Sequence, residues 1–132
     1  MRVLTGHSKV YGIFGDPVAH SLSPLMHNAA FDHCAVDAVY VPFHITADSL
    51  AAAVASLRVL DIKGINVTIP HKEAIVPLLD HVDPTARQIG AVNTVVNDHG
   101  RLVGYNTDSS GFLRSTIQDL GFSPHDKKVL LL

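Results

Sequence analysis

The sequence contains no tryptophan, and aromatic residues make up only 6% of its 132 positions. Proteins that bind single-stranded nucleic acids stack bases on aromatic side chains, so this scarcity argues against such a platform. The net charge is −2 with histidine neutral, so the chain has no basic field that could hold a nucleic acid or an anionic membrane surface. We therefore expect neither of these as a partner.

Cysteine and long apolar runs are also scarce. The single cysteine, Cys34, cannot form an internal disulfide, and a cytoplasmic location is the resulting expectation. No apolar run approaches the roughly 20 residues that a membrane-spanning helix needs. The N-terminus, Met-Arg-Val-Leu-Thr-Gly, lacks the apolar core of a signal peptide. What remains, 47% hydrophobic and 17% charged residues, is typical of one globular domain with its own core.

Nine histidines raise the question of a metal site. Metal-binding helices usually carry two histidines four residues apart, and no such pair occurs here. There is also no second cysteine to complete a ligand set. We therefore expect no metal site and interpret the histidines as scattered surface or locally hydrogen-bonded residues. They stand at positions 7, 20, 27, 33, 44, 71, 81, 99 and 125.

Short apolar segments alternate with helical patterns along the chain, which is typical of a parallel sheet covered by helices. Aspartate, histidine and glycine at positions 98–100 also predict a hairpin turn. We therefore predict an α/β fold: a mostly parallel twisted sheet, with helices on both faces and one antiparallel hairpin member. The expected strands are 9–14, 38–45, 64–69, 91–97, 101–105 and a buried start at 127–132; the expected helices are 24–34, 46–60 and 109–120, with helical turns within 71–89.

The most informative segment is 64–72, Gly-Ile-Asn-Val-Thr-Ile-Pro-His-Lys. Asn66 and Thr68 are two residues apart, so on a strand they point to the same face. Pro70 ends the ladder because it has no N–H group to donate. Lys72 then follows the carboxyl end of the strand, which is where open α/β sheets bind ligands. The segment therefore indicates a polar binding site rather than a purely structural strand.

Polar residues also cluster at the ends of other expected elements, and each has a structural alternative. Ser21 and Ser23 could cap the helix that follows, and for Ser23 alone the N-cap interpretation is favoured. Asn93 could serve a turn before the hairpin. Asp108 could be only the N-cap of the helix from 109, and Lys72 could be a solvated surface amine. Each residue taken alone is therefore weak evidence for a site.

Taken together, these clusters describe a coherent chemistry. Hydroxyl groups at a helix N-terminus suit a carboxylate, because free N–H groups and the helix dipole also point there. Asparagine and threonine side chains can donate to and accept from the hydroxyls of a polyol. A lysine with an ordinary pKa of about 10.4 needs a partner or a tuned environment to act as an acid or base. The predicted ligand is a small hydroxylated carboxylic acid.

Four motifs in sequence order resemble the signatures of shikimate dehydrogenases. They are 20–24 (His-Ser-Leu-Ser-Pro, followed by Met26-His-Asn28), 64–72, 90–94 (Gly-Ala-Val-Asn-Thr) and 104–108 (Gly-Tyr-Asn-Thr-Asp). The similarity covers roughly residues 8–121. It implies an NADP-dependent oxidoreductase that reduces 3-dehydroshikimate to shikimate in chorismate and aromatic amino acid biosynthesis.

The resemblance also implies roles for individual residues. Lys72 would be the catalytic acid/base and Asp108 its partner, orienting the amine and favouring its charged form. The two serines would bind the substrate carboxylate, and Asn66 would support the residues that bind the ring hydroxyls. The full set implied to bind the substrate is Ser21, Ser23, Asn66, Thr68, Lys72, Asn93 and Asp108.

The resemblance implies NADP as the cofactor of the intact enzyme. No Gly-x-Gly-x-x-Gly motif occurs in the sequence, so the main NADP-binding site is expected to be absent from this chain. We therefore expect a substrate-binding domain over 1–122 and the truncated start of a dinucleotide-binding domain over 123–132. The isolated chain should be inactive, and its apolar tail at 129–132 should promote self-association. The alternatives are a quinate/shikimate dehydrogenase and a stand-alone binding module for a cyclic hydroxy acid.

Overall fold

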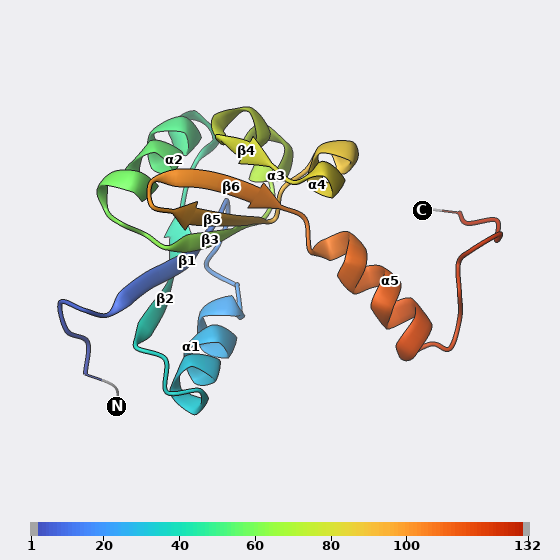
Figure 1. The fold of residues 1–132 in the computed structure, drawn as a ribbon, viewed down its shortest axis with the longest axis horizontal. Helices are drawn as coiled ribbons and strands as arrows, with labels where there is room; N and C mark the ends of the chain where they lie inside the picture. Colours follow the sequence, from blue (N-terminus) through green and yellow to red (C-terminus); the bar gives the residue numbers. More distant parts are fainter. Residues whose placement is uncertain (1–2, 131–132) are drawn as a thin grey trace.

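Six strands form one mixed sheet in the structure, a computed structural model that describes residues 3–130. They are β1 (Lys9–Gly15), β2 (Ala38–His44), β3 (Gly64–Val67), β4 (His81–Val82), β5 (Thr94–Asp98) and β6 (Arg101–Tyr105). Their order across the sheet is β2-β1-β3-β5-β6-β4 (Figure 1). β1 is parallel to β2 and β3, and β4 is parallel to β6, whereas β5 is antiparallel to both neighbours. The predicted sheet with its antiparallel hairpin member is confirmed.

Helices lie on both faces of this sheet. Figure 1 shows α1 on one side and α2 and α3 on the other, whereas α5 extends away from the sheet. The predicted helices agree with the observed ones, but β4 was not predicted, because a two-residue strand has no readable alternation. The helical elements are α1 (Ser23–His33), η1 (Ala47–Ser49), α2 (Leu50–Val59), α3 (His71–Ala74), η2 (Val76–Leu78), α4 (Pro84–Ile89) and α5 (Asp108–Gln118).

The larger hydrophobic core lies between the sheet and α2. Leu57 from α2 packs there with Phe14 from β1 and Leu102 from β6, and all three are at most 2% exposed. Strand alternation explains which residues enter this core, because neighbouring side chains on a strand point to opposite faces. On β5, Val95 is buried in it and Val96 is exposed. One face of the sheet is therefore sealed by apolar packing.

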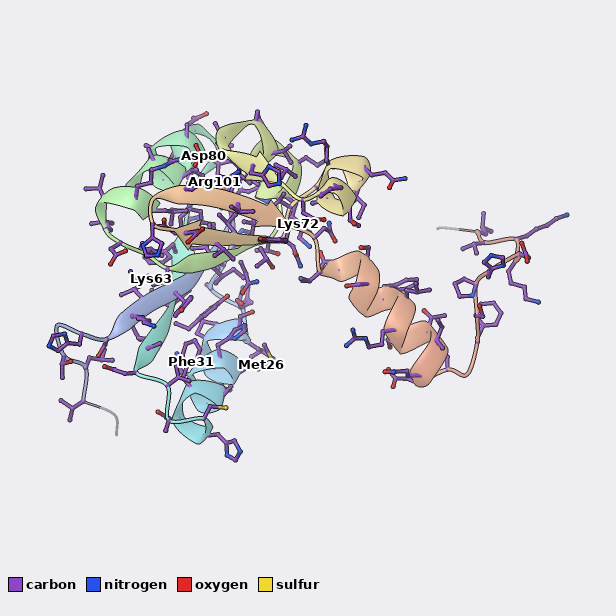
Figure 2. All side chains as sticks on the ribbon, in the orientation of Figure 1. Met26, Phe31, Lys63, Lys72, Asp80 and Arg101 are labelled. Carbon is purple, nitrogen blue, oxygen red and sulfur yellow. The ribbon has the colours of Figure 1, made fainter. Side chains whose placement is uncertain are left out.

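The opposite face is only partly covered. A smaller cluster of Ile13, Val18 and Tyr40 lies there, with Phe31 of α1 packed against it. No residue of α1 is fully buried, and Met26 lies on the outer side of the helix, away from Phe31 (Figure 2). Because α1 packs against β2, the β5 and β6 part of this face remains open.

The C-terminal segment departs from the prediction in one respect. Gly121, at φ +62°, follows α5 in the left-handed conformation that favours glycine after a helix, as predicted. Residues 127–130, however, form no strand, and Val129 and Leu130 are exposed. No strand within 3–130 pairs with them, so the predicted buried strand is wrong for this part. Residues 131–132 lie outside the described residues. None of the helices within 3–130 is long and apolar enough to cross a membrane.

Candidate active site

Lys72 and Asp108 form an ion pair at one edge of the sheet. Lys72 lies in α3, just after β3, and Asp108 begins α5, just after β6. Lys72 Nζ donates to Asp108 Oδ2 over 2.6 Å across 36 positions of sequence. Because β3 and β6 are parallel in direction with β5 reversed between them, their carboxyl ends reach the same edge. The structure thus brings together the two residues that the sequence predicted as the catalytic pair.

Asn93 holds the carboxylate of this pair in place. It is 8% exposed and immediately precedes β5, whose start lies at the same edge of the sheet. Its Nδ2 group donates to Asp108 Oδ1 and to Thr107 Oγ1, each over 2.8 Å, and its Oδ1 accepts from the Thr107 N–H. Both Nδ2 hydrogens are therefore engaged. In this arrangement Asn93 orients Asp108, and Lys72 and Asp108 are the groups presented to solvent.

The structural alternative for Asp108 is wrong. α5 begins at Asp108 itself, and Thr107 occupies the N-cap position without a side-chain capping bond. The N–H of Ser109 is instead satisfied by Asn106 Oδ1 over 3.2 Å. The Asp108 carboxylate therefore does not cap the helix, and it accepts hydrogen bonds from Lys72 and Asn93.

Asn66 in β3 belongs to a second hydrogen-bonded group. Its Oδ1 accepts from the Tyr40 hydroxyl over 2.7 Å, and its Nδ2 makes two longer bonds of 3.4 Å, to Asn93 O and Thr94 Oγ1. The bond to Asn93 O joins this group to the Lys72–Asp108 pair. Asn66 therefore supports the site from β3, which agrees with the role expected for it.

Tyr40 is the site residue that sequence reasoning missed. A tyrosine inside an apolar strand is usually a core residue, and no motif marked this one. Its burial raises its pKa to about 12, and a hydrogen bond from the Ser23 hydroxyl opposes this rise. The only available signal was its place on the strand next to β1, which cannot be read without the strand order.

Ser21 and Ser23 lie at the N-terminus of α1. Ser21 Oγ accepts from the Ser23 N–H over 3.3 Å. The helix begins at Ser23, and Leu22 occupies the N-cap position without a side-chain capping bond. The N-cap interpretation of Ser23 is therefore wrong, because Ser23 is the first residue of the helix and Leu22 precedes it at the N-cap position. Both hydroxyls remain partly accessible at this helix terminus.

Thr68 lies outside the hydrogen-bonded network of Asn66, Asn93, Lys72 and Asp108, as the two serines do. β3 ends at Val67, earlier than predicted, although the Thr68 N–H still donates to Phe14 O over 2.9 Å. A Cβ atom added to Gly15 would lie 2.5 Å from Thr68 Cγ2, so this glycine allows Thr68 to approach β1 closely. Within residues 3–130 the Thr68 hydroxyl makes no hydrogen bond, so it is available to a ligand.

Two hollows adjoin these residues. A cavity of about 490 Å³ between α1, β3 and β5 is lined by Tyr40, Asn66 and Thr94, and by the rings of Tyr11, His27 and Phe31. Neither Lys72 nor Asp108 lines this cavity. Lys72 instead lines a hollow of about 320 Å³ with Ile69, Pro70, Glu73 and Ala91. The ion pair thus lies on an open surface, at the rim of the sheet.

The described residues do not fit a nicotinamide nucleotide. A pyrophosphate needs a glycine-rich loop that leads from a strand into a helix N-terminus. None of the nine glycines forms such a loop with its neighbours in sequence. What this part of the chain offers is a polar edge for the organic substrate and a lysine that can give or take a proton.

Comparisons with known proteins show which proteins this chain resembles in sequence and fold. A relative from Geobacter metallireducens, named shikimate dehydrogenase (NADP(+)), is 57% identical over 129 residues, which are 98% of this chain and 45% of the relative. Shikimate 5-dehydrogenase from Listeria monocytogenes, solved with shikimate and NAD, has a TM-score of 0.87 at 40% identity and covers 93% of this chain and 42% of its own. The 5-ketofructose reductase of a Gluconobacter strain has a TM-score of 0.84 at 36% identity, over 94% of this chain and 44% of its own.

The chain spans less than half of the length of these relatives. The family model for the shikimate dehydrogenase substrate-binding domain matches residues 13–95, which include β2, β3, Lys72 and Asn93. The chain therefore belongs to the shikimate dehydrogenase family and carries that family's substrate-binding domain.

Proposed function

We propose that this chain is the substrate-binding part of an NADP-dependent shikimate dehydrogenase, which interconverts 3-dehydroshikimate and shikimate. The observation that carries the proposal is the Lys72–Asp108 pair, held by Asn93 at the edge of the sheet. The names of the relatives support the same activity. The division into a domain over 1–122 and the start of a second over 123–132, and a cytoplasmic location, stay predictions.

The chain's own contribution to the reaction is the proton. When a ketone is reduced, its oxygen develops negative charge and must receive a proton. A carbonyl oxygen placed beside Lys72 Nζ would receive it from the ammonium group. Asp108 then stabilises the charged lysine before transfer and keeps its amine aimed at the substrate, since the two groups are 2.6 Å apart. In the reverse direction the neutral amine removes the proton from the hydroxyl.

The other site residues would orient the substrate. The hydroxyls of Ser21 and Ser23 at the N-terminus of α1 suit its carboxylate, where the helix dipole adds attraction. The unpaired Thr68 hydroxyl and the Asn66 Nδ2 group suit its ring hydroxyls. Since Asn93 is already saturated with hydrogen bonds, its contact with a substrate requires an exchange of one bond to Asp108 or Thr107.

Two experiments test the proposal. The first titrates the purified chain with shikimate by NMR, and we expect a dissociation constant on the order of millimolar. The second joins residues 1–121 to the remaining part of the Geobacter metallireducens relative; this hybrid protein should oxidise shikimate with NADP, whereas the isolated chain should not. No shikimate binding by the chain together with an inactive hybrid protein would overturn the proposal.

Substrate choice is measured on the same hybrid protein. Quinate turnover equal to or above shikimate turnover would favour the quinate/shikimate alternative. Shikimate binding by a complete protein that lacks any nucleotide-binding half would favour the stand-alone module. Sedimentation of 1–132 beside a chain ending at Ser123 tests self-association, because Val129 and Leu130 are exposed and apolar. Purely monomeric behaviour of both would exclude it.

A further inference from the structure

Tyr40 is held unusually firmly for a residue that no motif identifies. It is 4% exposed on β2, and its ring stacks on His27 of α1 with centroids 4.4 Å apart and planes at 17°. The side chain of Asn28 brackets its backbone: Oδ1 accepts from the Tyr40 N–H over 2.9 Å, and Nδ2 donates to Tyr40 O over 2.8 Å. The same Nδ2 group donates to Pro24 O. Ring and backbone are therefore both fixed relative to the first turns of α1.

The hydroxyl of Tyr40 bonds to a residue of the predicted substrate site on another strand. It donates to Asn66 Oδ1 on β3 over 2.7 Å. A buried tyrosine needs a hydrogen-bond partner in any case, so a satisfied core residue would be the plain interpretation. The partner here, however, belongs to the predicted substrate set, which a purely structural partner need not do.

The bond to Asn66 decides which end of its amide faces outward. Because the Tyr40 hydroxyl holds Oδ1 on its own side, Nδ2 is directed to the other side of the amide. The two bonds that Nδ2 makes, each 3.4 Å, are at the long limit for such contacts and leave it able to donate to a closer oxygen. Asn66 and Tyr40 also line the cavity of about 490 Å³ together.

Resting on the proposed function, we propose that Tyr40 is a positioning residue for substrate binding: its hydroxyl fixes the Asn66 amide so that Nδ2 is presented as a donor to an oxygen of the substrate. Tyr40 would act through Asn66 and make no contact with the reacting atoms.

The test uses Tyr40→Phe, which removes the hydroxyl and keeps the stacked ring. Shikimate titrations of the 132-residue chain should then give a dissociation constant about fivefold weaker, the loss expected for one hydrogen bond. The matched control is Tyr11→Phe, whose ring lines the same cavity and whose hydroxyl makes no hydrogen bond within residues 3–130. It should leave the dissociation constant unchanged. Equal effects of the two substitutions, or no effect of Tyr40→Phe, would overturn the proposal.

A double-mutant cycle separates positioning from general damage. If Tyr40 acts through Asn66, Tyr40→Phe should add almost nothing once Asn66→Ala has been made. Additive losses would mean that the phenol stabilises the site in some other way, and the proposal would fail. A spectrum of folded Tyr40→Phe protein with unshifted backbone resonances in β1 and α2 shows that the fold itself is intact.

A third measurement needs no ligand and so stands apart from the proposed function. The side-chain N–H₂ resonances of Asn66 should be as ordered as the backbone in the wild-type chain and distinctly more mobile in Tyr40→Phe. Unchanged order in the variant would overturn the positioning role even if shikimate binds. Lost order in the variant, with no shikimate binding by the wild type, would keep the role of Tyr40 and remove only the proposed substrate.

Discussion

The helices α2 and α5 both follow a strand of the sheet, yet the fold uses them differently. α2 buries Leu50, Val54 and Leu57 in the larger core. α5 buries only Thr116, and its apolar residues Phe112 and Ile117 remain exposed. What α5 supplies to the rest of the chain is its first residue, Asp108, which pairs with Lys72. Helix α2 therefore stabilises the domain through its buried side chains, whereas α5 contributes Asp108 and buries little of its own surface.

The largest expected effect on the functional side of this comparison comes from Lys72→Ala. In the hybrid protein the substitution should lower kcat by ~10²–10⁴-fold, the usual contribution of an acid/base group, with a much smaller change in KM. Steady-state kinetics measure both constants. Lys63→Ala is the matched control, because Lys63 is at the opposite end of β3 in Figure 2 and pairs with Asp61. A kcat loss of similar size in both variants would remove Lys72 from the reaction.

On the structural side, Leu57→Ala should lower the free energy of unfolding by ~2–5 kcal/mol, because it opens a cavity in a sealed core. Ile117→Ala removes a comparable side chain from α5, where it is 47% exposed, and should cost about 1 kcal/mol or less. Urea unfolding of the two variants of the 132-residue chain measures the difference. Equal losses would show that α5 packs on the domain in solution and would break the comparison.

A smaller effect is expected from Ser23→Ala at the N-terminus of α1. It should raise KM for shikimate by roughly tenfold and leave kcat within about twofold, because a contact to the carboxylate acts equally on ground state and transition state. Ser56→Ala in α2, whose hydroxyl only donates to Ala53 O, is the matched control and should change neither constant. A fall in kcat with constant KM in Ser23→Ala would place the reacting carbon at this end of the site.

The smallest effect concerns the pH dependence of stability. The N–H of Leu102 and the guanidinium of Arg58 donate to the Asp80 carboxylate and hold its pKa below the ordinary value of 3.8. A lowered folded-state pKa means that this contribution to stability is present above about pH 5 and is lost as the pH falls through the folded pKa. Thermal melts of wild type and Asp80→Asn should therefore differ at pH 7 and converge towards pH 3. A constant difference over this range would contradict the assignment.

The sequence predicted those site residues whose position depends only on where a strand ends. Lys72 and Asp108 each follow a recognisable strand, and Asn66 lies within one. The hydrogen bonds from Asn93 to Thr107 and Asp108 could not be predicted from the sequence, because they depend on the antiparallel position of β5 between β3 and β6. Tyr40 could not be found either, because its hydroxyl bonds to Asn66 on a strand that is distant in sequence.

Errors at element boundaries have a local cause. The N-cap of α1 is Leu22, at φ −85° and ψ −5°, rather than the serine next to it. Sequence preference favours serine at this position, but the helix already begins at Ser23, one residue earlier than that preference predicts. Residues 127–130 of the expected C-terminal strand form none, because pairing needs a neighbouring strand that residues 3–130 do not provide.

The antiparallel strand β5 has one further consequence. The distance between the site residues depends on the register in which β5 pairs with β6. Asn93 and Asp108 are attached to two antiparallel strands whose pairing begins at Thr94 and Tyr105, and the Asn93 N–H is bonded to Tyr105 O. A slip of one residue between these strands would move the two side chains apart by about 3.4 Å. That distance exceeds the whole length of the 2.8 Å bond from Asn93 to Asp108. Correct pairing of the hairpin and correct placement of the Asp108 carboxylate beside Asn93 therefore depend on the same strand register.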